Sequence, residues 1–355
     1  MKIFDNVKSI EFRVRLNGDG CVNYDSKEQM YTLANNGYRK GSGIFNENVK
    51  YAKKRFNSDN TFSYKQSSDC IKHEMYKDCM EFMNTRLSYV PMVLYRALAQ
   101  PSYLMRGWVF TDGAKISRKS CVTITDSVSD IKHNYVDMEV HSTSGAKGEK
   151  PKDKDDKGNT SLFFEENVGK EQYSFDGYID LTEIQFISLD PVFDRLNVDV
   201  DGGENEEIFL TALKENFGDD IKIDYYYIKS SITEDEFAER GILLNRDAVD
   251  SMVKDTLKRI MNINIWRSNS YLKYDSITVY VNYNNGTREE ITIDNIEDLS
   301  NYYFNYFEKY QVADIEKIMN NKRIYEELKE KYNSKRKADK ESQSKSKKSK
   351  NEVTE

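Results

Sequence analysis

Apolar and polar residues alternate most regularly near the start of the chain, in residues 7–16. The apolar positions of this segment are Ile10, Phe12, Val14 and Leu16. Charged residues, Arg13 among them, occupy the positions between them. Because successive side chains of a β-strand point to opposite faces of its sheet, this spacing predicts a strand with one buried face. The sequence Asn-Gly-Asp-Gly at residues 17–20 then predicts a turn.

Residues 103–129 contain two runs of apolar and β-branched residues, which predict two strands joined by a basic connection. Arg106 lies inside the first run, and Gly113 marks the turn between the runs. The polar residues near this turn are Lys115, Arg118, Lys119 and Ser120. An arginine in an apolar strand is costly to bury unless an anion meets it, so the stretch is a candidate anion site. The alternative is an amphipathic strand pair whose cations face water.

Residues 65–83 carry apolar side chains at a spacing of 3.6 residues, which predicts a helix with one buried face. Ser67 or Ser68 can cap its first turn. The polar residues around this turn are Lys65, Ser67, Ser68, Lys72 and His73. Unsatisfied N–H groups and the helix dipole favour an anion at a helix N-terminus, so the turn is a candidate phosphate site. An ordinary capped core helix is the alternative.

The same two periodicities predict the remaining elements. Helices are expected over residues 50–56, 86–100, 245–264, 295–310 and 313–332. Strands are expected over residues 179–189 and 221–228, and a hairpin with an Asn-Gly turn over residues 276–283 and 287–293. The resulting βαββαβ order predicts an α+β fold of the ferredoxin-like or RNA-recognition-motif (RRM) kind. Open sheets of this kind commonly bind single-stranded RNA.

A long excursion, residues 133–189, interrupts this order with two alternating limbs and a polar tip at residues 142–160. The tip contains Gly, Pro, Lys and Asp without an apolar anchor, which predicts a solvated loop. Since a lone hairpin is marginal in water, we expect the limbs to pack on another copy of the chain or on a partner. The aromatic residues expected to be exposed on the limbs are Tyr135, Phe163, Phe164 and Tyr173. A hairpin folded back on its own domain is the alternative.

The composition describes a polar chain of 355 residues with a net charge of −7. Residues 335–355 carry eight Lys or Arg and four Asp or Glu, a net charge of +4, which leaves −11 for residues 1–334. This acidic body lowers the expectation of nucleic-acid binding but does not exclude it, because the relevant field acts within about 8 Å at physiological salt. We expect the tail, residues 333–355, to be disordered.

Four cysteines in a chain without a secretory signal sequence predict reduced thiols in the cytoplasm. No apolar run approaches the roughly 20 residues needed to cross a bilayer, so no membrane span is expected. Cys70, His73 and Cys79 lack a fourth ligand at a usable spacing, so no zinc site is expected. The chain also lacks a G-x-x-x-x-G-K-S/T phosphate loop and an H-E-x-x-H motif, and no cofactor is expected.

Six segments, taken in their order along residues 8–195, resemble the backbone subunits of CRISPR effector complexes. These subunits are RAMP-superfamily proteins that line up along a CRISPR RNA in Cascade-type assemblies. The segments are LNGDGCVNYD, SSDCIKHEMY, LMRGWVF, RKSCVTITDSVS, SLFFEENVG and IDLTEIQFIS. The resemblance implies an RRM-like palm (residues 1–132 and 191–332) with loop-rich web or fingers insertions, and a thumb hairpin (residues 133–190).

In the family that the chain resembles, the palm holds the guide RNA and the thumb of one copy folds over the guide bound by its neighbour. The expected partners are therefore CRISPR RNA, further copies of the chain, other CRISPR effector subunits, and target DNA or RNA that pairs with the guide. The candidate RNA-binding residues are Arg13, Lys65, Ser67, Ser68, Lys72, His73, Arg106, Lys115, Arg118, Lys119 and Ser120.

RNA-cleaving relatives place an aspartate in a loop near the bound target. Asp19, Asp25 and several other aspartates are available here, but none of them lies in a motif that matches. We therefore expect a subunit without catalytic residues. The alternatives are a metal-dependent ribonuclease of the same fold, in which loop aspartates hold a divalent ion, and a structural protein that binds no RNA.

Overall fold

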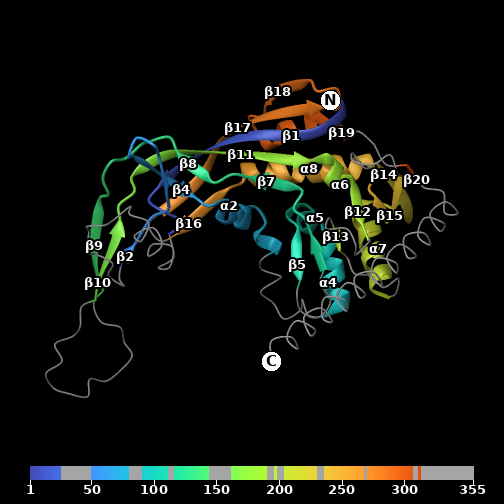
Figure 1. Ribbon diagram of the computed structural model, residues 1–355, viewed down its shortest axis with the longest axis horizontal. Coiled ribbons are helices and arrows are strands. Elements are labelled where there is room, and N and C mark those ends of the chain that lie inside the picture. The colour runs from blue at the N-terminus through green and yellow to red at the C-terminus, as the bar shows by residue number, and fades with distance from the viewer. Residues whose placement is uncertain are drawn as a thin grey trace, which may run out of the picture.

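The largest element of the computed structural model is a curled, mostly antiparallel sheet with helices packed against one face (Figure 1). Strand β1 (Lys2–Asp19) runs through the middle of this sheet. It pairs antiparallel with β11 (Lys170–Asp180) on one side and with β17 (Ser270–Tyr283) on the other. The structure describes residues 1–24, 49–79, 90–110, 116–143, 161–189, 196–197, 204–229, 236–267, 270–306 and 311–312.

The strand with one buried face that the alternation near the N-terminus predicts is confirmed as β1. Phe12 and Val14 are buried, whereas Arg13 and Arg15 are exposed on the open face of the sheet, which the helices do not cover. The strand is longer than predicted, because it continues through the Asn-Gly-Asp segment in register with β11. The chain leaves the strand at Gly20, whose φ of 73° is a conformation that glycine adopts without strain.

The centre of the sheet has the strand order β17, β1, β11 and then β7 and β8, with every neighbouring pair antiparallel. Strands β7 (Val122–Ile124) and β8 (Ser127–Ser129) both pair with β11. Along the chain, α2 (Ser68–Met75) lies between β1 and β7, and α8 (Arg246–Met261) lies between β11 and β17. The fold therefore combines helices with an antiparallel sheet, as the α+β prediction requires.

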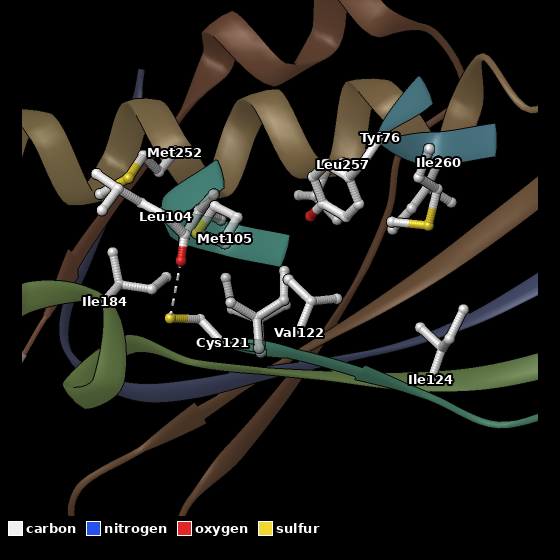
Figure 2. Close-up of a cluster of buried hydrophobic side chains, with 14 of the residues drawn as sticks. Tyr76, Leu104, Met105, Cys121, Val122, Ile124, Ile184, Met252, Leu257 and Ile260 are labelled. Atoms are coloured by element: carbon white, nitrogen blue, oxygen red, sulfur yellow. Dashed lines mark hydrogen bonds between the residues drawn. The ribbon is translucent and has the colours of Figure 1, made fainter. Parts of the chain in front are cut away.

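The main hydrophobic core lies between this sheet and α8 (Figure 2). Met252 and Leu257 of α8 point toward the sheet, where Val122 of β7 faces them. Leu104 of the short helix α5 (Pro101–Arg106) lies between the two layers and is fully buried. Burial of such side chains contributes roughly 1.5–3 kcal/mol each. The core thus fixes the relative positions of α5, α8 and the sheet.

Three smaller sheets flank the central one. The first contains β2 (Val49–Lys50), β10 (Ser161–Glu166) and β9 (Met138–Thr143). The second contains β12 (Phe186–Ser188), β15 (Glu236–Leu243), β14 (Ile223–Lys229) and β20 (Gln311–Val312). The third contains β13 (Leu196–Asn197), β6 (Ile116–Arg118) and β5 (Trp108–Phe110). The remaining elements are β3 (Lys54–Phe56), β4 (Phe62–Gln66), α4 (Pro91–Leu98), α6 (Leu181–Gln185), α7 (Glu204–Phe217), β16 (Asn264–Arg267), β18 (Arg288–Thr292), the 3-10 helix η3 (Ile296–Asn301) and β19 (Tyr302–Tyr306).

Several predicted elements are confirmed. The helix expected at residues 245–264 is α8, and the side chain of Asn245 caps it by accepting a hydrogen bond from the Ala248 N–H at 2.8 Å. The hairpin across Asn-Gly is β17 and β18, and Gly286 has a φ of 83° in its turn. Strand β14 and helices α2 and α4 also form where the pattern predicts them.

The prediction of one strand through residues 104–110 is wrong. Residues 101–106 form α5, in which Pro101 occupies a first-turn position that suits its fixed φ. Gly107 ends this helix, and only the three residues of β5 are extended. Leu104 and Met105 are both fully buried, so burial does not alternate here. The apparent alternation of the sequence has no structural counterpart in this stretch.

Three further predictions are corrected by pairing partners and caps. Residues 54–56, expected to be helical, form β3 because they pair with β4. Residues 179–189 do not form one strand, since the Asp180 side chain caps α6 by accepting from the Thr182 N–H at 2.9 Å. Residues 296–306, expected to be helical, form η3 and then β19, which pairs with β1. The helix expected at 313–332 and the tail lie outside the described residues.

The excursion is confirmed as a hairpin only in its outer part. Strands β9 and β10 pair antiparallel, and the tip between them lies outside the described residues. Strand β10 also pairs with β2, so the hairpin has a third strand from its own chain. Tyr173 lies in β11, where it is 1% exposed, because β11 belongs to the central sheet. The prediction that Tyr173 is an exposed aromatic of the hairpin is therefore wrong.

Candidate nucleic-acid interface

Helices α2 and α5 and strands β5 and β6 enclose a cavity of about 430 Å³, which we call the α2–α5 pocket. Four of the candidate RNA-binding residues meet in its lining. These are Lys72, His73, Arg106 and Arg118. The other described lining residues are Asp69, Gly107, Trp108 and Val109. Residues that lie far apart in the sequence are thus brought to one pocket, and its described lining has more cations than carboxylates.

Gly107 makes the close packing at the floor of this pocket possible. Its φ of 76° is a conformation that residues with a side chain rarely adopt. A Cβ atom at this position would also lie 2.5 Å from the Arg118 carbonyl oxygen and 2.6 Å from the Ser120 nitrogen. The connection from α5 to β5 therefore requires glycine for two reasons. It places Arg106 and Trp108 on either side of a tight turn at the pocket.

Lys72 is the half-buried cation of the pocket. Its Nζ donates to Ser120 Oγ at 3.3 Å. Burial lowers the pKa of Lys72, the neighbouring Asp69 acts in the opposite direction, and the positive charge of Arg106 lowers it further. The ammonium group therefore carries a desolvation cost that Asp69 offsets only in part. An anion in the pocket would favour the charged form of Lys72.

Arg118 has a structural role as well as a place in the pocket. It is 5% exposed, and its Nε donates to the Leu104 carbonyl oxygen at 2.7 Å. One of its terminal nitrogens, Nη2, donates to the Glu183 carbonyl oxygen at 3.1 Å. These bonds tie β6 to α5 and to α6. Much of the donor capacity of Arg118 is therefore used within the protein.

The N-terminus of α2 is occupied by a carboxylate of the chain itself. Ser67 is the N-cap, and the next residue, Ser68, donates its N–H to Asp126 Oδ1 at 2.9 Å. The other oxygen of Asp126 accepts from Lys65 Nζ at 2.8 Å. Burial acts to raise the pKa of Asp126, but the bonds from Lys65 and Ser68 outweigh it, so the pKa is lowered. Asp126 thus lies where the sequence predicts a phosphate.

Arg13 lies apart from the pocket, on the open face of the central sheet. Its guanidinium donates to both carboxylate oxygens of Asp176, at 2.8 and 3.2 Å. Nearby, Arg288 pairs with Glu11 at 2.9 Å. These residues line a shallow groove of about 620 Å³ in which cations and carboxylates alternate. The charges of this groove are largely balanced.

The remaining candidates are dispersed. Lys119 is exposed next to the pocket strand β6, and Lys115 lies outside the described residues. Tyr135 is 75% exposed just before β9. Phe163 and Phe164 lie in β10, where the backbone of Phe164 pairs with both β9 and β2.

Sequence reasoning missed two residues that shape this site. Trp108 follows the turn at Gly107 and lines the pocket, although it is 3% exposed. Asp126 comes directly after β7, and its role depends on a helix about 60 residues earlier in the chain. The Gly-Trp sequence that follows Arg106 could have indicated that Trp108 lies at a turn beside this cation. No local pattern indicates the second, because its partners are distant in sequence.

Within the described ranges, no group of three or more His, Cys, Asp or Glu side chains could hold a metal ion. In the same ranges, the helices are all too short or too polar to cross a membrane.

Residues 6–310 match the sequence model of the family described as Type I-Fv CRISPR-associated protein Cas7fv-like. The chain belongs to this family. The match confirms the resemblance to CRISPR backbone subunits that the order of the six segments indicates. None of the curated proteins matches the chain.

Two solved structures are weakly similar to this Cas7fv-like chain. A chain of a "CRISPR RNA-guided surveillance complex" has a TM-score of 0.36 and 10% sequence identity, and the alignment covers 78% of this chain and 70% of that chain. A chain of a "CRISPR RNA-guided surveillance complex, pre-nicking" has a TM-score of 0.38 and 9% identity, with 78% and 77% covered. The assignment of this chain therefore rests on the family model.

Proposed function

We propose that this Cas7fv-like chain is a backbone subunit of a CRISPR effector complex and binds the CRISPR RNA at the α2–α5 pocket. The observation that carries the proposal is the convergence of Lys72 and Arg106 on one pocket, whose described lining has more cations than carboxylates. Cations of this kind attract phosphates of every sequence. A subunit that carries guides of many sequences requires such contacts. The bound guide would be displayed for pairing with target nucleic acid, beside other effector subunits in the cytoplasm.

The arrangement of the central sheet supports an RRM-like palm, which we assign to residues 1–132 and 191–332 together with β11, a strand that the sequence-based boundary places in the thumb. Strand β11 lies between β1 and β7, and β1 lies between β11 and β17. The two strand-helix-strand units, β1–α2–β7 and β11–α8–β17, therefore interleave in one antiparallel sheet. This is the interleaving expected of the split β-α-β arrangement.

The guide site is tested by replacing Lys72 and Arg106 together with glutamine and titrating RNA at several salt concentrations. Each lost phosphate contact should reduce the slope of log binding constant against log salt concentration by about one. The reduction should be the same for RNAs of unrelated sequence. The matched control is Lys77→Gln, because Lys77 lies one turn further along the α2 region and is exposed. Unchanged affinity and salt dependence in the double variant would show that the guide lies elsewhere.

The β9–β10 hairpin supports the second part of the proposal, in which the outer part of residues 133–190 acts as a thumb and copies of the chain assemble along the guide. Among the described strands, β2 is the one that adds to the hairpin, and Tyr135 at the hairpin's base is exposed. A hairpin that packs on the next copy makes a head-to-tail contact that repeats without closing, unless the rotation permits a ring.

Assembly is tested with two deletions, each closed by a short glycine linker, and by the mass of the protein with and without RNA. Removing residues 139–165, which keeps Glu166 and its ion pair with Lys54, should abolish multi-copy assembly and leave a folded monomer. Removing only the tip, residues 144–160, is the control and should have a mild effect. Assembly that survives the larger deletion would contradict the proposed thumb.

We propose further that the subunit holds RNA without cutting it. The competing function is a metal-dependent ribonuclease of the same fold. Its candidate metal ligands include Asp19, which lies in the described part of the chain, and Asp25, which lies outside it. Incubation of the assembled complex with complementary RNA and Mg²⁺ separates the two. Intact target supports the proposal, and cuts at regular spacing support the ribonuclease.

A further inference from the structure

One corner of the open sheet face carries an aromatic pair, with one ring exposed and the other half-buried, that the proposed guide site does not use. Trp266 of the edge strand β16 is 59% exposed, and it lies directly opposite Tyr271 of β17 in the strand register. The neighbouring residues Ile265 and Leu272 are 5% and 1% exposed and point into the core. Since side chains alternate along a strand, Trp266 and Tyr271 project from the other face. Strand β16 forms the end of the central sheet.

Three contacts hold the indole of Trp266 in place. Its Nε1 donates to Asn264 Oδ1 at 2.9 Å. The rings of Trp266 and Tyr271 have centroids 5.3 Å apart and planes inclined by 40°. Lys273 Nζ lies 4.5 Å from the Trp266 centroid and 5.1 Å from the Tyr271 centroid. An exposed side chain that is fixed in this way loses little conformational freedom when a flat ligand stacks on it.

The surroundings of this pair are polar rather than aliphatic. In register on β1, Asp19 lies opposite Tyr271 and Asn17 lies opposite Lys273. The nearby Asp275 accepts a hydrogen bond from Asn17 Nδ2 at 2.8 Å, so this carboxylate is engaged within the protein. Further along the same face of β1, Arg15 is exposed opposite Ser276. The aromatic pair therefore has the cation Lys273 beside it, and the described residues around it are polar, unlike the apolar border typical of a protein-binding patch.

We propose that Trp266, Tyr271 and Lys273 form a stacking platform for an unpaired base of single-stranded nucleic acid. The base would stack on the indole, and Lys273 would attract the adjacent phosphate. Aromatic side chains combined with cations are the usual means of binding single strands without sequence preference. The platform is separate from the α2–α5 pocket and does not require a guide in that pocket. A second copy of the chain or another protein on this surface is the competing occupant.

The chain contains two tryptophans, and they report on the two sites separately. Trp108 lines the α2–α5 pocket, and Trp266 belongs to the platform. In full-length Trp108→Phe protein, the tryptophan emission comes from Trp266 alone. In full-length Trp266→Phe protein, it comes from Trp108 alone. Failure of the platform can therefore be distinguished from failure of the proposed guide site.

The experiment titrates each single-tryptophan protein with single-stranded RNA, single-stranded DNA and an abasic oligomer of the same length and charge. Base-containing strands should quench Trp266, and the abasic oligomer should not. In the otherwise unchanged chain, Trp266→Ala should weaken binding of base-containing strands by about 5- to 100-fold while affinity for the abasic oligomer is kept. Ile3→Ala, which removes another exposed apolar side chain, is the control and should change neither. Lys273→Gln should weaken binding of both kinds of oligomer.

Three outcomes would overturn the platform. Trp266 emission could remain constant while Trp108 responds to the same strands. The abasic oligomer could quench Trp266 emission as strongly as base-containing strands do. Trp266 emission could also change with protein concentration in the absence of nucleic acid, which would show that this surface contacts another copy of the chain. Because Trp266 is exposed, its replacement is not expected to unfold the protein, and circular dichroism of each variant checks this.

Discussion

At the root of the β9–β10 hairpin, basic side chains pair with carboxylates of the protein, whereas the described lining of the α2–α5 pocket has more cations than carboxylates. At the root, Lys54 and Glu166 form an ion pair in which the side chains are 5% and 0% exposed. Glu166 also accepts from the Ala52 N–H at 3.2 Å. His133 Nε2 and Glu171 Oε1 are 2.7 Å apart nearby. The pocket instead gathers lysine, histidine and arginine side chains around one aspartate.

The difference separates two uses of charge in one chain. Buried pairs at the root join β3, β10 and β11 and hold the hairpin against the central sheet, so their loss should affect folding. Partly buried cations in the pocket carry a desolvation cost that bound phosphates can offset, so their loss should affect binding. The N-terminus of α2 is intermediate, because Asp126 supplies an internal anion there. The predictions below test this division, from the largest effect to the smallest.

Replacing Glu166 with glutamine should lower the free energy of unfolding by about 3–5 kcal/mol, because Lys54 stays buried after losing its carboxylate. Chemical denaturation measures this loss. The control is Glu215→Gln, since Glu215 pairs with Arg96 on the surface, where both side chains are about half exposed. The control should cost less than about 1 kcal/mol. Equal small losses in both variants would mean that the root pair does not stabilise the fold.

Replacing Asp126 with asparagine should lower the free energy of unfolding by about 1–2 kcal/mol, because charged hydrogen bonds at the α2 N-terminus are lost. The pKa of Asp126 is lowered in the folded protein, despite the opposing effect of burial, by Lys65 and the Ser68 N–H. Its stabilising effect is therefore present above the ordinary aspartate pKa and is lost as the pH falls through the lowered value.

Denaturation of both proteins across acidic pH tests this. The gap between wild type and Asp126→Asn should close as the pH falls. A gap that is independent of pH would show that the carboxylate charge contributes nothing.

Replacing Asp69 with asparagine should raise RNA affinity several-fold at low salt. Asp69 is the one carboxylate among the described residues that line the pocket, and it opposes the attraction of phosphates. The increase should shrink as salt rises. Glu207→Gln, an exposed carboxylate in the first turn of α7, is the control for the change in net charge. An equal increase in the control would assign the effect to overall charge.

Replacing Lys72 with methionine should give the smallest effect, a change in the pH dependence of stability. Burial, assisted by Arg106, lowers the pKa of Lys72 in the folded protein, while Asp69 acts against this. Between that lowered value and the ordinary lysine pKa of about 10.4, the unfolded chain binds more protons, so wild-type stability rises with pH relative to the variant. The unfolding free energies of the two proteins, measured at several alkaline pH values, show whether the stability of wild type relative to the variant rises with pH as expected. A constant difference would contradict the desolvation of Lys72.

Parts of the fold and of the site could be predicted because their signals are local. The alternation in β1, the Asn-Gly turn of the β17–β18 hairpin and the Asn cap of α8 each lie within a few residues. The candidate set also included Lys72 and Arg106, which the structure brings to one pocket. The strands β3 and β19 were missed, because both form by pairing with distant segments rather than by their own pattern.

The sequence by itself determined the buried faces of β1 and α8, the Asn-Gly turn between β17 and β18, the Asn245 cap of α8, and the resemblance of the chain to CRISPR backbone subunits. Only the tertiary structure decided how each charge and aromatic ring is used. Tyr173 is buried because β11 lies inside the sheet, and Asp126 takes the anion position at α2 because β7 ends beside it. Trp266 is exposed because it projects from the face of the edge strand β16 that lies opposite the buried Ile265. Periodicity fixes which face of a strand or helix a residue lies on, but the neighbours on that face come from segments tens to hundreds of residues away.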